Sequence, residues 1–260
     1  MKKTTKMLAI LLAAMTALSG CGGSGTTTTQ TEGKTETTAA AEKTGTETAQ
    51  KGPKDEVVTM AVISSWDTLN IYNTSGNYGN AVADQLFERL VTRTHDGVIE
   101  PRLATEWQIA DDNKSMTFKL AENALWHDGE KLTANDIVFT CKAMTNPDVD
   151  NYYRSAFNVL AGTDDDGIAA DTDQLGVEAV DDYTVKFSFK EPKDQDTILN
   201  AFLSFLYVLP EHILDTGNYA DINNSSFWTS PVGAGPFKYV KDTAGETLET
   251  IIRDALILRH

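Results

Sequence analysis

The chain has 260 residues, of which 41% are hydrophobic, so it can bury a sizeable core in one large domain or two small ones. Its 38 acidic residues outnumber its 22 basic ones and give a formal charge of −16. This balance argues against a nucleic-acid partner, which needs a local excess of Lys and Arg. Two cysteines exclude a disulfide framework or a Cys-rich metal site.

The first 20 residues are organised like a secretory signal. Three lysines within the first six residues precede an apolar run from 7 to 18, which is too short for a permanent membrane span. The Leu-Ser-Gly-Cys sequence at 18–21 resembles the bacterial lipoprotein box, in which a cysteine receives diacylglycerol and becomes the new N-terminus. We therefore expect export, removal of residues 1–20, and a lipid on Cys21 that anchors the protein at the outer face of the bacterial cytoplasmic membrane.

Residues 22–56 contain no Leu, Ile, Val, Met or aromatic side chain. Such a segment buries too little apolar surface to offset its chain entropy, so residues 21–56 are expected to form a disordered tether behind the lipid. A tolerated low-complexity insertion is the alternative interpretation. Lipidation of Cys21 would leave Cys141 as the one remaining thiol, so no intramolecular disulfide is expected.

Ordered structure is expected from residue 57, where a β-branched run to residue 63 suits a strand buried on both faces. Apolar residues four apart predict an amphipathic helix over 78–90, and alternation predicts a half-buried strand over 115–120. Thr133 and Asp136 resemble a capping box with Asp in place of Glu. They open a helix that is expected to end near residues 146–147, with these side chains facing inward: Ile137, Val138, Cys141 and Met144.

The second half of the chain continues the mixture of helix and strand. The clearest strand is predicted over 183–189, where aromatic and aliphatic residues alternate with polar ones. A helix is predicted over 196–206, and Pro210 breaks it. The order predicts a mixed α and β fold without the regular βαβ repeat of a doubly wound nucleotide-binding domain.

No motif for catalysis or metal binding is complete. The chain has no P-loop, no G-x-S-x-G, no H-E-x-x-H and no C-x-x-C sequence. His127 is expected to be a turn residue, and Cys141 a small core residue. The acidic loop 162–173 has glycine where a calcium loop needs its first carboxylate and Asp173 where it needs glutamate, so it predicts a solvated loop. We expect no catalysis, no metal and no cofactor.

Loops that follow predicted strands and helices carry aromatic, hydroxyl and amide side chains. Such loops commonly line a cleft for a small ligand, although surface loops often share this composition. The candidate ligand-binding residues fall in three segments. They are Ser64, Ser65, Trp66 and Asp67 after the first strand, Tyr72, Asn77 and Tyr78 leading into the first helix, and Tyr152 and Tyr153 after the second helix.

Several segments together resemble the extracytoplasmic solute-binding lipoproteins of ABC importers, family 5, the peptide and nickel type. The most specific segment, WHDGEKLTANDIVF at 126–139, is similar to the family signature F-H-D-G-x-x-L-T-A-x-D-V-x-F. PRLATEW at 101–107 and VEAVDDYTVKF at 177–187 also match family segments, as does PVGAGPF at 231–237, where Ala234 replaces a threonine.

The resemblance implies a periplasmic-binding-protein-like α/β fold in which two lobes close on a solute and present it to a membrane permease. The 57–240 segment would be the first lobe, a mixed sheet with flanking helices. By position, the resemblance places first-lobe ligand contacts at residues 64–67 and 152–153. The HDG turn and the 233–235 segment would be structural rather than ligand-reading.

Family members are much longer, so the resemblance also predicts a truncated product with an aberrant tail at 241–260. Such a product would lack the second-lobe carboxylate of the peptide binders and would bind solute weakly or not at all. The expected role is a monomeric receptor for peptides. A nickel chelate, an oligosaccharide, or a purely structural role for the lipoprotein stay open as alternatives.

Overall fold

The computed structural model describes residues 68–74, 77–243 and 247–252, all of which belong to the second of two units, Val58–His260. The predicted strand at 57–63, the signal, Cys21 and the tether lie outside these residues. Within them, no helix combines the length and the apolar character that crossing a bilayer requires.

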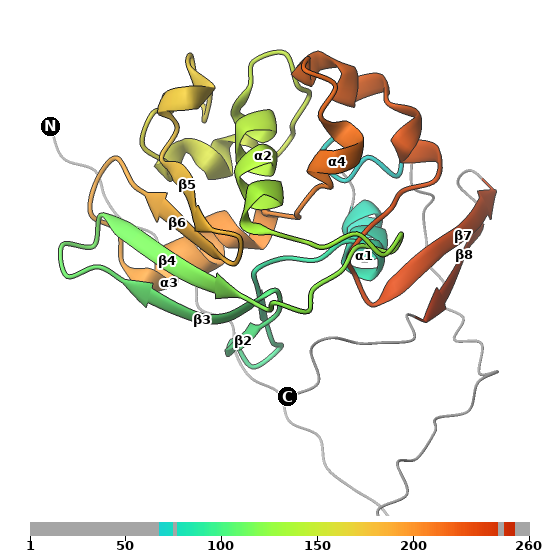
Figure 1. Ribbon diagram of the computed structural model, residues 1–260, viewed down its shortest axis with the longest axis horizontal. Coiled ribbons are helices and arrows are strands. Elements are labelled where there is room, and N and C mark those ends of the chain that lie inside the picture. The colour runs from blue at the N-terminus through green and yellow to red at the C-terminus, as the bar shows by residue number, and fades with distance from the viewer. Residues whose placement is uncertain (1–67, 75–76, 244–246, 253–260) are drawn as a thin grey trace, which may run out of the picture. The chain divides into compact units, whose positions relative to one another are not determined.

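The central element is a four-stranded antiparallel sheet with the strand order β3-β4-β6-β5 (Figure 1). Its strands are β3 (Ala104–Ile109), β4 (Ser115–Leu120), β5 (Val177–Asp181) and β6 (Thr184–Ser188). The predicted strand at 115–120 is confirmed, and the one predicted at 183–189 is confirmed with slightly shorter bounds. Alternation explains both, because Met116, Phe118, Val185 and Phe187 are buried while their neighbours point outward.

Two short antiparallel pairs lie outside this sheet. One joins β1 (Val91–Arg93) to β2 (Ile99–Pro101), and the other joins β7 (Phe237–Thr243) to β8 (Thr247–Ile252). All strand pairs of the described residues are antiparallel, so the mixed α and β class without βαβ repeats is confirmed.

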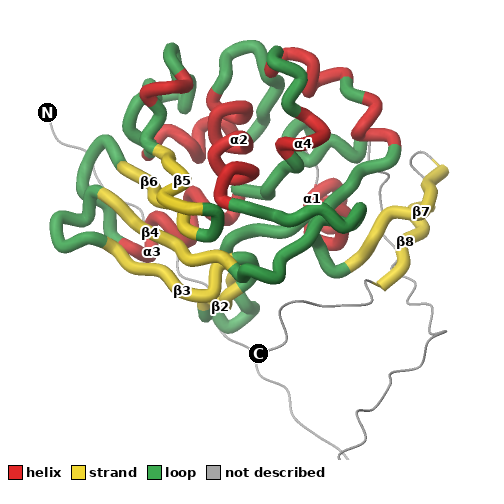
Figure 2. The backbone as a smooth tube through the Cα atoms, in the orientation of Figure 1, coloured by secondary structure: helices red, strands yellow, loops and turns green. Residues whose placement is uncertain are grey.

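Short helices and long loops make up the remainder (Figure 2). The α-helices are α1 (Asn77–Leu86), α2 (Ala134–Thr145), α3 (Gln195–Thr197) and α4 (Glu211–Leu214). Turns of 3₁₀ helix cover Arg154–Val159, Thr172–Gln174, Leu203–Phe205, Tyr219–Asn224 and Ser226–Thr229, and a π-helical turn covers Ile198–Phe202.

Helix α2 begins and ends where the sequence predicted. The backbone N–H of Thr133 donates to Asp136 Oδ2 at 2.8 Å, which is the reciprocal arm of the capping box. The other carboxylate oxygen of Asp136 accepts the N–H of Glu211 at 3.0 Å, so the same side chain also caps α4. Burial raises the pKa of the Asp136 carboxyl, and these two backbone donors act in the opposite direction.

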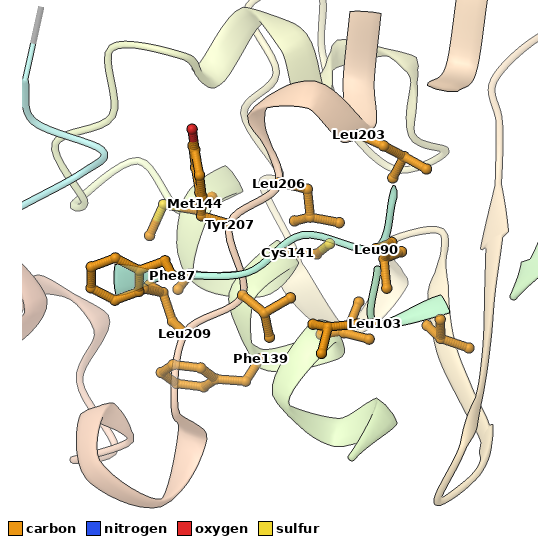
Figure 3. Packing of buried hydrophobic residues seen from close by; sticks show 14 of the residues in the cluster. Phe87, Leu90, Leu103, Phe139, Cys141, Met144, Leu203, Leu206, Tyr207 and Leu209 are labelled. Atoms are coloured by element: carbon orange, nitrogen blue, oxygen red, sulfur yellow. The ribbon is translucent and has the colours of Figure 1, made fainter. Parts of the chain in front are cut away.

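The inner face of α2 packs over β5 and β6 (Figure 1). Ile137, Cys141 and Met144 are fully buried there, whereas Val138 is only half-buried. Figure 3 shows Cys141 among aliphatic side chains that include Leu90, Leu203 and Leu206. The prediction that Cys141 is a core residue is therefore confirmed, and burial raises the pKa of its thiol.

The helix predicted over 78–90 is four residues too long at its C-terminal end. It stops at Leu86, because the Leu86 carbonyl accepts the N–H of Gly235 at 2.9 Å. In a longer helix, the same carbonyl would accept the N–H of Leu90. Gly233 and Gly235 permit this approach, since a Cβ on Gly233 would lie 1.7 Å from the Leu86 oxygen. A tertiary contact thus overrides the local apolar pattern, and Phe87 and Leu90 remain buried outside the helix.

The helix predicted over 196–206 is confirmed as continuous helical geometry over 195–205, but its type changes along the segment. Only Gln195–Thr197 is α-helical, after which the chain widens into the π turn and tightens into 3₁₀ geometry. The side chains expected inside are nevertheless buried, namely Ile198, Leu199, Phe202, Leu203 and Leu206. Their spacing suits a helical face without specifying which hydrogen-bond pattern the backbone adopts.

Edge-to-face aromatic contacts connect the sheet to these segments. Phe187 lies 5.7 Å from Phe118 and 5.4 Å from Phe202, and Phe202 lies 5.5 Å from Phe157, measured between ring centroids. All four rings are fully buried. The series joins two strands, the π turn and the 3₁₀ turn at 154–159 into one core.

We predict that Phe187→Ala lowers the free energy of unfolding by about 3–5 kcal/mol, because it removes the central ring of this series and leaves a cavity. Urea unfolding followed by circular dichroism measures the change. The control is Val180→Ala on β5, whose side chain is 57% exposed and whose loss should cost less than about 0.5 kcal/mol. Similar losses in the two variants would contradict the assignment of Phe187 to the core.

Candidate functional site

Two loops that are distant in the sequence meet around a polar cleft. The first covers Thr68–Thr74, and the second follows α2 over 146–153. The N–H of Tyr152 donates to the Tyr72 carbonyl at 2.9 Å, and the hydroxyl of Tyr153 donates to the Thr74 carbonyl at 3.2 Å. The cleft has a volume of about 480 Å³ and is lined by Asn73, Pro147, Asp150, Asn151, Tyr152 and Arg154.

Asparagine side chains hold the second loop in place. Asn151 Nδ2 donates to the Met144 carbonyl near the end of α2, and Asn151 Oδ1 accepts the N–H of Tyr153. Asn223 Oδ1 accepts the N–H of Asp150 at 2.8 Å, and Asn223 Nδ2 donates to the Asp148 carbonyl at 2.8 Å. These bonds satisfy backbone groups that have no ladder partner, so they fix the loop without regular secondary structure.

The adjacent tyrosines 152 and 153 play different structural roles. The ring of Tyr152 is 64% exposed at the cleft. The ring of Tyr153 stacks on Phe205 with 5.0 Å between centroids and an interplanar angle of 19°, and its hydroxyl lies 3.0 Å from Asn80 Oδ1 on α1. Tyr153 therefore joins three segments behind the cleft, while Tyr152 presents its ring to solvent.

The structure places Tyr72 differently from the prediction that it contacts a ligand. Its side chain is 1% exposed, and its hydroxyl donates to the Tyr207 carbonyl at 2.6 Å. Burial raises the pKa of this hydroxyl well above its usual value, so the group remains a donor. Tyr72 is a core residue that joins the first loop to the 203–208 segment, and it presents no surface to a solute here.

The other predicted contacts cannot be placed. Ser64, Ser65, Trp66 and Asp67 lie outside the described residues, as does the lipidation candidate Cys21. Asn77 and Tyr78 form the start of α1, but the structure does not describe their side chains.

Of the residues that line the cleft, sequence reasoning named Tyr152 and missed the other five, namely Asn73, Pro147, Asp150, Asn151 and Arg154. Asn73 and Asn151 had a weak signal, because each adjoins a predicted tyrosine, Tyr72 and Tyr152 respectively, in a loop of turn-forming residues. Arg154 gave no signal that distinguishes it from other surface arginines. It begins a 3₁₀ turn, and its position at the cleft follows from how the loop packs.

A wider hollow of about 950 Å³ lies at one end of the sheet. It is lined by Thr105, Glu106, Lys119, Leu120, Ala121, Glu122, Asn123, Asp181, Asp182, Tyr183 and Thr184. Its one lysine is paired with Glu106 at 3.2 Å. The hollow includes none of the predicted ligand residues, so the smaller cleft is the candidate site.

The acidic loop 162–173 uses its carboxylates to bond its own backbone. Asp164 Oδ1 accepts the N–H groups of Asp166 and Ile168, and Asp171 Oδ1 accepts the N–H of Asp173. Among the described residues, no group of three or more His, Cys, Asp or Glu side chains is arranged to hold a metal ion.

The family model for "Bacterial extracellular solute-binding proteins, family 5 Middle" matches residues 98–250, which is more than half of the chain. The chain belongs to this family of solute-binding proteins.

Similar family members include proteins named for peptide binding. The murein peptide-binding protein MppA of Escherichia coli is 32% identical over 65% of this chain, and the oligopeptide-binding protein OppA of Haemophilus influenzae is 29% identical over 68%. The chain spans about a third of the length of these relatives, 31% and 32% respectively.

Solved structures agree with this assignment. The OppA complex of Haemophilus influenzae with the peptide RPPGFSPFR has a TM-score of 0.62 and 28% identity, covering 72% of this chain and 36% of that protein. NikZ of Campylobacter jejuni in complex with Ni(L-His) has a TM-score of 0.59 and 27% identity, covering 77% and 36%. The periplasmic-binding-protein-like class predicted from the sequence is therefore confirmed.

The signature segment of this family member has a structural role, as predicted. His127 lies in the turn before α2, where its Nδ1 accepts the N–H of Gly233 at 3.1 Å and its Nε2 lies 2.9 Å from the Gly235 carbonyl. An imidazole that accepts at Nδ1 is neutral and carries its proton on Nε2. His127 thus ties the HDG turn to the glycine segment that ends α1.

We predict that Tyr153→Phe lowers the free energy of unfolding by about 1 kcal/mol, because it removes the hydroxyl bonds to Thr74 and Asn80 and keeps the ring stacked on Phe205. Tyr152→Phe is the matched control at the neighbouring position, and its exposed hydroxyl should contribute almost nothing. Urea unfolding of both variants makes the comparison. An equal effect of both substitutions would argue against the role of Tyr153 in joining the two loops.

Proposed function

We propose that this chain serves as the solute-binding component of an ABC importer that captures peptides outside the membrane and delivers them to a permease. The observation that carries the proposal is the likeness to the peptide complex of OppA, combined with a cleft at the position where the sequence predicted first-lobe contacts. Relatives of this chain are transporter components rather than enzymes, so we propose no catalytic step.

The chemistry of the cleft suits a peptide. Its lining combines an amide, an exposed aromatic ring and both signs of charge, in Asn73, Tyr152, Asp150 and Arg154. Peptide backbones present amide donors and acceptors at every residue, and water can bridge to varied side chains. Tyr152 remains 64% exposed, so the cleft is open and would enclose little of a peptide. We therefore expect a dissociation constant in the high-micromolar to millimolar range, which corresponds to a binding free energy of about −4 to −6 kcal/mol.

Binding of a nickel chelate is a second candidate, favoured by the likeness to NikZ with its Ni(L-His) ligand. The same cleft would then bind the amino-acid part of the chelate. The two candidates differ in whether a metal-free peptide binds.

Titration of the chain with trialanine, followed by amide chemical shifts in NMR spectra, tests the peptide proposal. We expect saturable shifts at residues 150–154, recovery of the peptide intact by mass spectrometry, and no shifts with maltotriose. Shifts with nickel–histidine but not with trialanine would favour the second candidate. Hydrolysis of the peptide would refute a binding-only role.

The lipid anchor is part of the proposal. We propose that Cys21 carries diacylglycerol and holds the domain at the outer face of the cytoplasmic membrane through the 22–56 segment. We predict that expression in a bacterial host with lipoprotein processing moves the protein to the detergent phase, and that Cys21→Ala returns it to the aqueous phase. Mass spectrometry showing an unmodified Met1 on the wild-type protein would contradict the anchor.

A further inference from the structure

The second loop of the cleft depends on one side chain that belongs to neither loop. Asn223 lies outside the cleft lining, on the 3₁₀ turn Tyr219–Asn224, yet its amide bonds the backbone of two loop residues. Its Oδ1 accepts the N–H of Asp150 and its Nδ2 donates to the Asp148 carbonyl, both at 2.8 Å. Within the described part of the chain, no other group bonds either of these backbone atoms. Asn223 thus completes the hydrogen bonding of the stretch that leads directly into the cleft residues 150–152.

The turn that carries this amide is itself anchored in the core. Ile222 is 2% exposed, and its carbonyl accepts the indole N–H of Trp228 at 2.7 Å. The ring of Trp228 is buried and lies 6.3 Å from that of Phe87 just after α1, measured between centroids. Tyr219, at the start of the turn, lies 5.9 Å from Phe139 on α2. These contacts fix the backbone from which the amide extends, so the amide can hold a loop that has no sheet or helix of its own.

Such bonds matter most when a loop has to possess its bound shape before the solute arrives. Residues 146–150 form only bends and turns, and the side chains of Asp148 and Asp150 are exposed. Without Asn223, water could bond the freed backbone groups and the loop could adopt other shapes. The apparent dissociation constant rises in inverse proportion to the fraction of molecules in the binding-competent shape. Losing Asn223 would therefore weaken binding without removing any group that lines the cleft.

We infer that Asn223 is a positioning residue of the cleft, which sets the affinity for the solute by holding the second loop in its binding shape. The inference rests on the proposed function and deepens it, since it names a residue that governs peptide affinity from outside the cleft. The next residue, Asn224, has the same side chain but is exposed, so it provides a matched control.

NMR measurements on the full chain test the inference in two ways. Titration with trialanine gives the dissociation constant, and hydrogen exchange compares the amide of Asp150 with that of Cys141 inside α2. For Asn223→Ala we expect a dissociation constant at least about fivefold higher, as a binding shape populated in about a fifth of the molecules implies. Exchange at Asp150 should accelerate at least about tenfold more than exchange at Cys141, because the change favours a local opening of the loop. Asn224→Ala should alter neither quantity.

Asn223→Asp is a second variant with nearly the same shape. It keeps an oxygen for the N–H of Asp150 and loses the donor for the Asp148 carbonyl, so one of the two bonds remains. We expect its affinity for trialanine to fall at least about twofold, but by less than that of Asn223→Ala. This variant keeps the inference testable even where Asn223→Ala does not fold. An affinity and an exchange pattern equal to those of the wild-type protein would overturn the inference.

The outcomes separate this inference from the proposed function. If the wild-type protein and Asn223→Ala bind trialanine equally tightly, Asn223 does not govern the cleft, and the peptide proposal stands. If exchange at Asp150 and at Cys141 accelerates by the same factor in Asn223→Ala, the effect is a general loss of stability, and the positioning role is overturned. If the wild-type protein does not bind trialanine, the proposed function and the role of Asn223 in affinity fail together.

Discussion

The need to satisfy backbone hydrogen bonds in loops decides how the candidate site is built. The cleft walls have no sheet to pair their N–H and C=O groups, and buried groups without partners are costly. Side chains from elsewhere supply the partners instead, with Asn223 bonding two backbone groups of the second loop and Tyr153 bonding the carbonyl of Thr74. The loop backbones thus have hydrogen-bond partners without a sheet, while the side chains of Asp150 and Tyr152 remain exposed.

The same principle explains the family motifs. The Leu86 carbonyl accepts from Gly235 rather than from the next helical turn, and the backbone of Gly233 bonds His127. Three motifs that are far apart in the sequence, the end of α1, the HDG turn and the glycine segment, therefore form one structural unit. Asp128 extends it to α4 through a 2.9 Å contact with His212. These residues hold distant segments together and do not line the cleft, so their match identifies the family without identifying the solute.

Local patterns predicted the parts of the fold that depend on local physics. The strand at 115–120 follows from alternation, and the start of α2 follows from the capping residues Thr133 and Asp136. Errors arose where a distant segment decided the outcome, as at the end of α1 and at the aromatic residue Tyr72. A tyrosine in a loop rich in asparagine and serine suggests a ligand surface, but a carbonyl 135 residues away makes Tyr72 a core residue. Arg154 could not be predicted for the same reason, because only the packed loop brings it to the cleft.

Electrostatics at the cleft are decided locally despite the strong acidity of the chain. A formal charge of −16 repels anions at long range, but at physiological ionic strength this field is screened over about 8 Å. A peptide with one ammonium and one carboxylate carries no net charge and is little affected by the remaining field. Within the cleft, Asp150 and Arg154 place charges of both signs where a solute would lie at contact distance and screening would be weak. The charges that line the cleft therefore matter more to a neutral peptide than the net charge of the chain, which disfavours solutes that carry only negative charge.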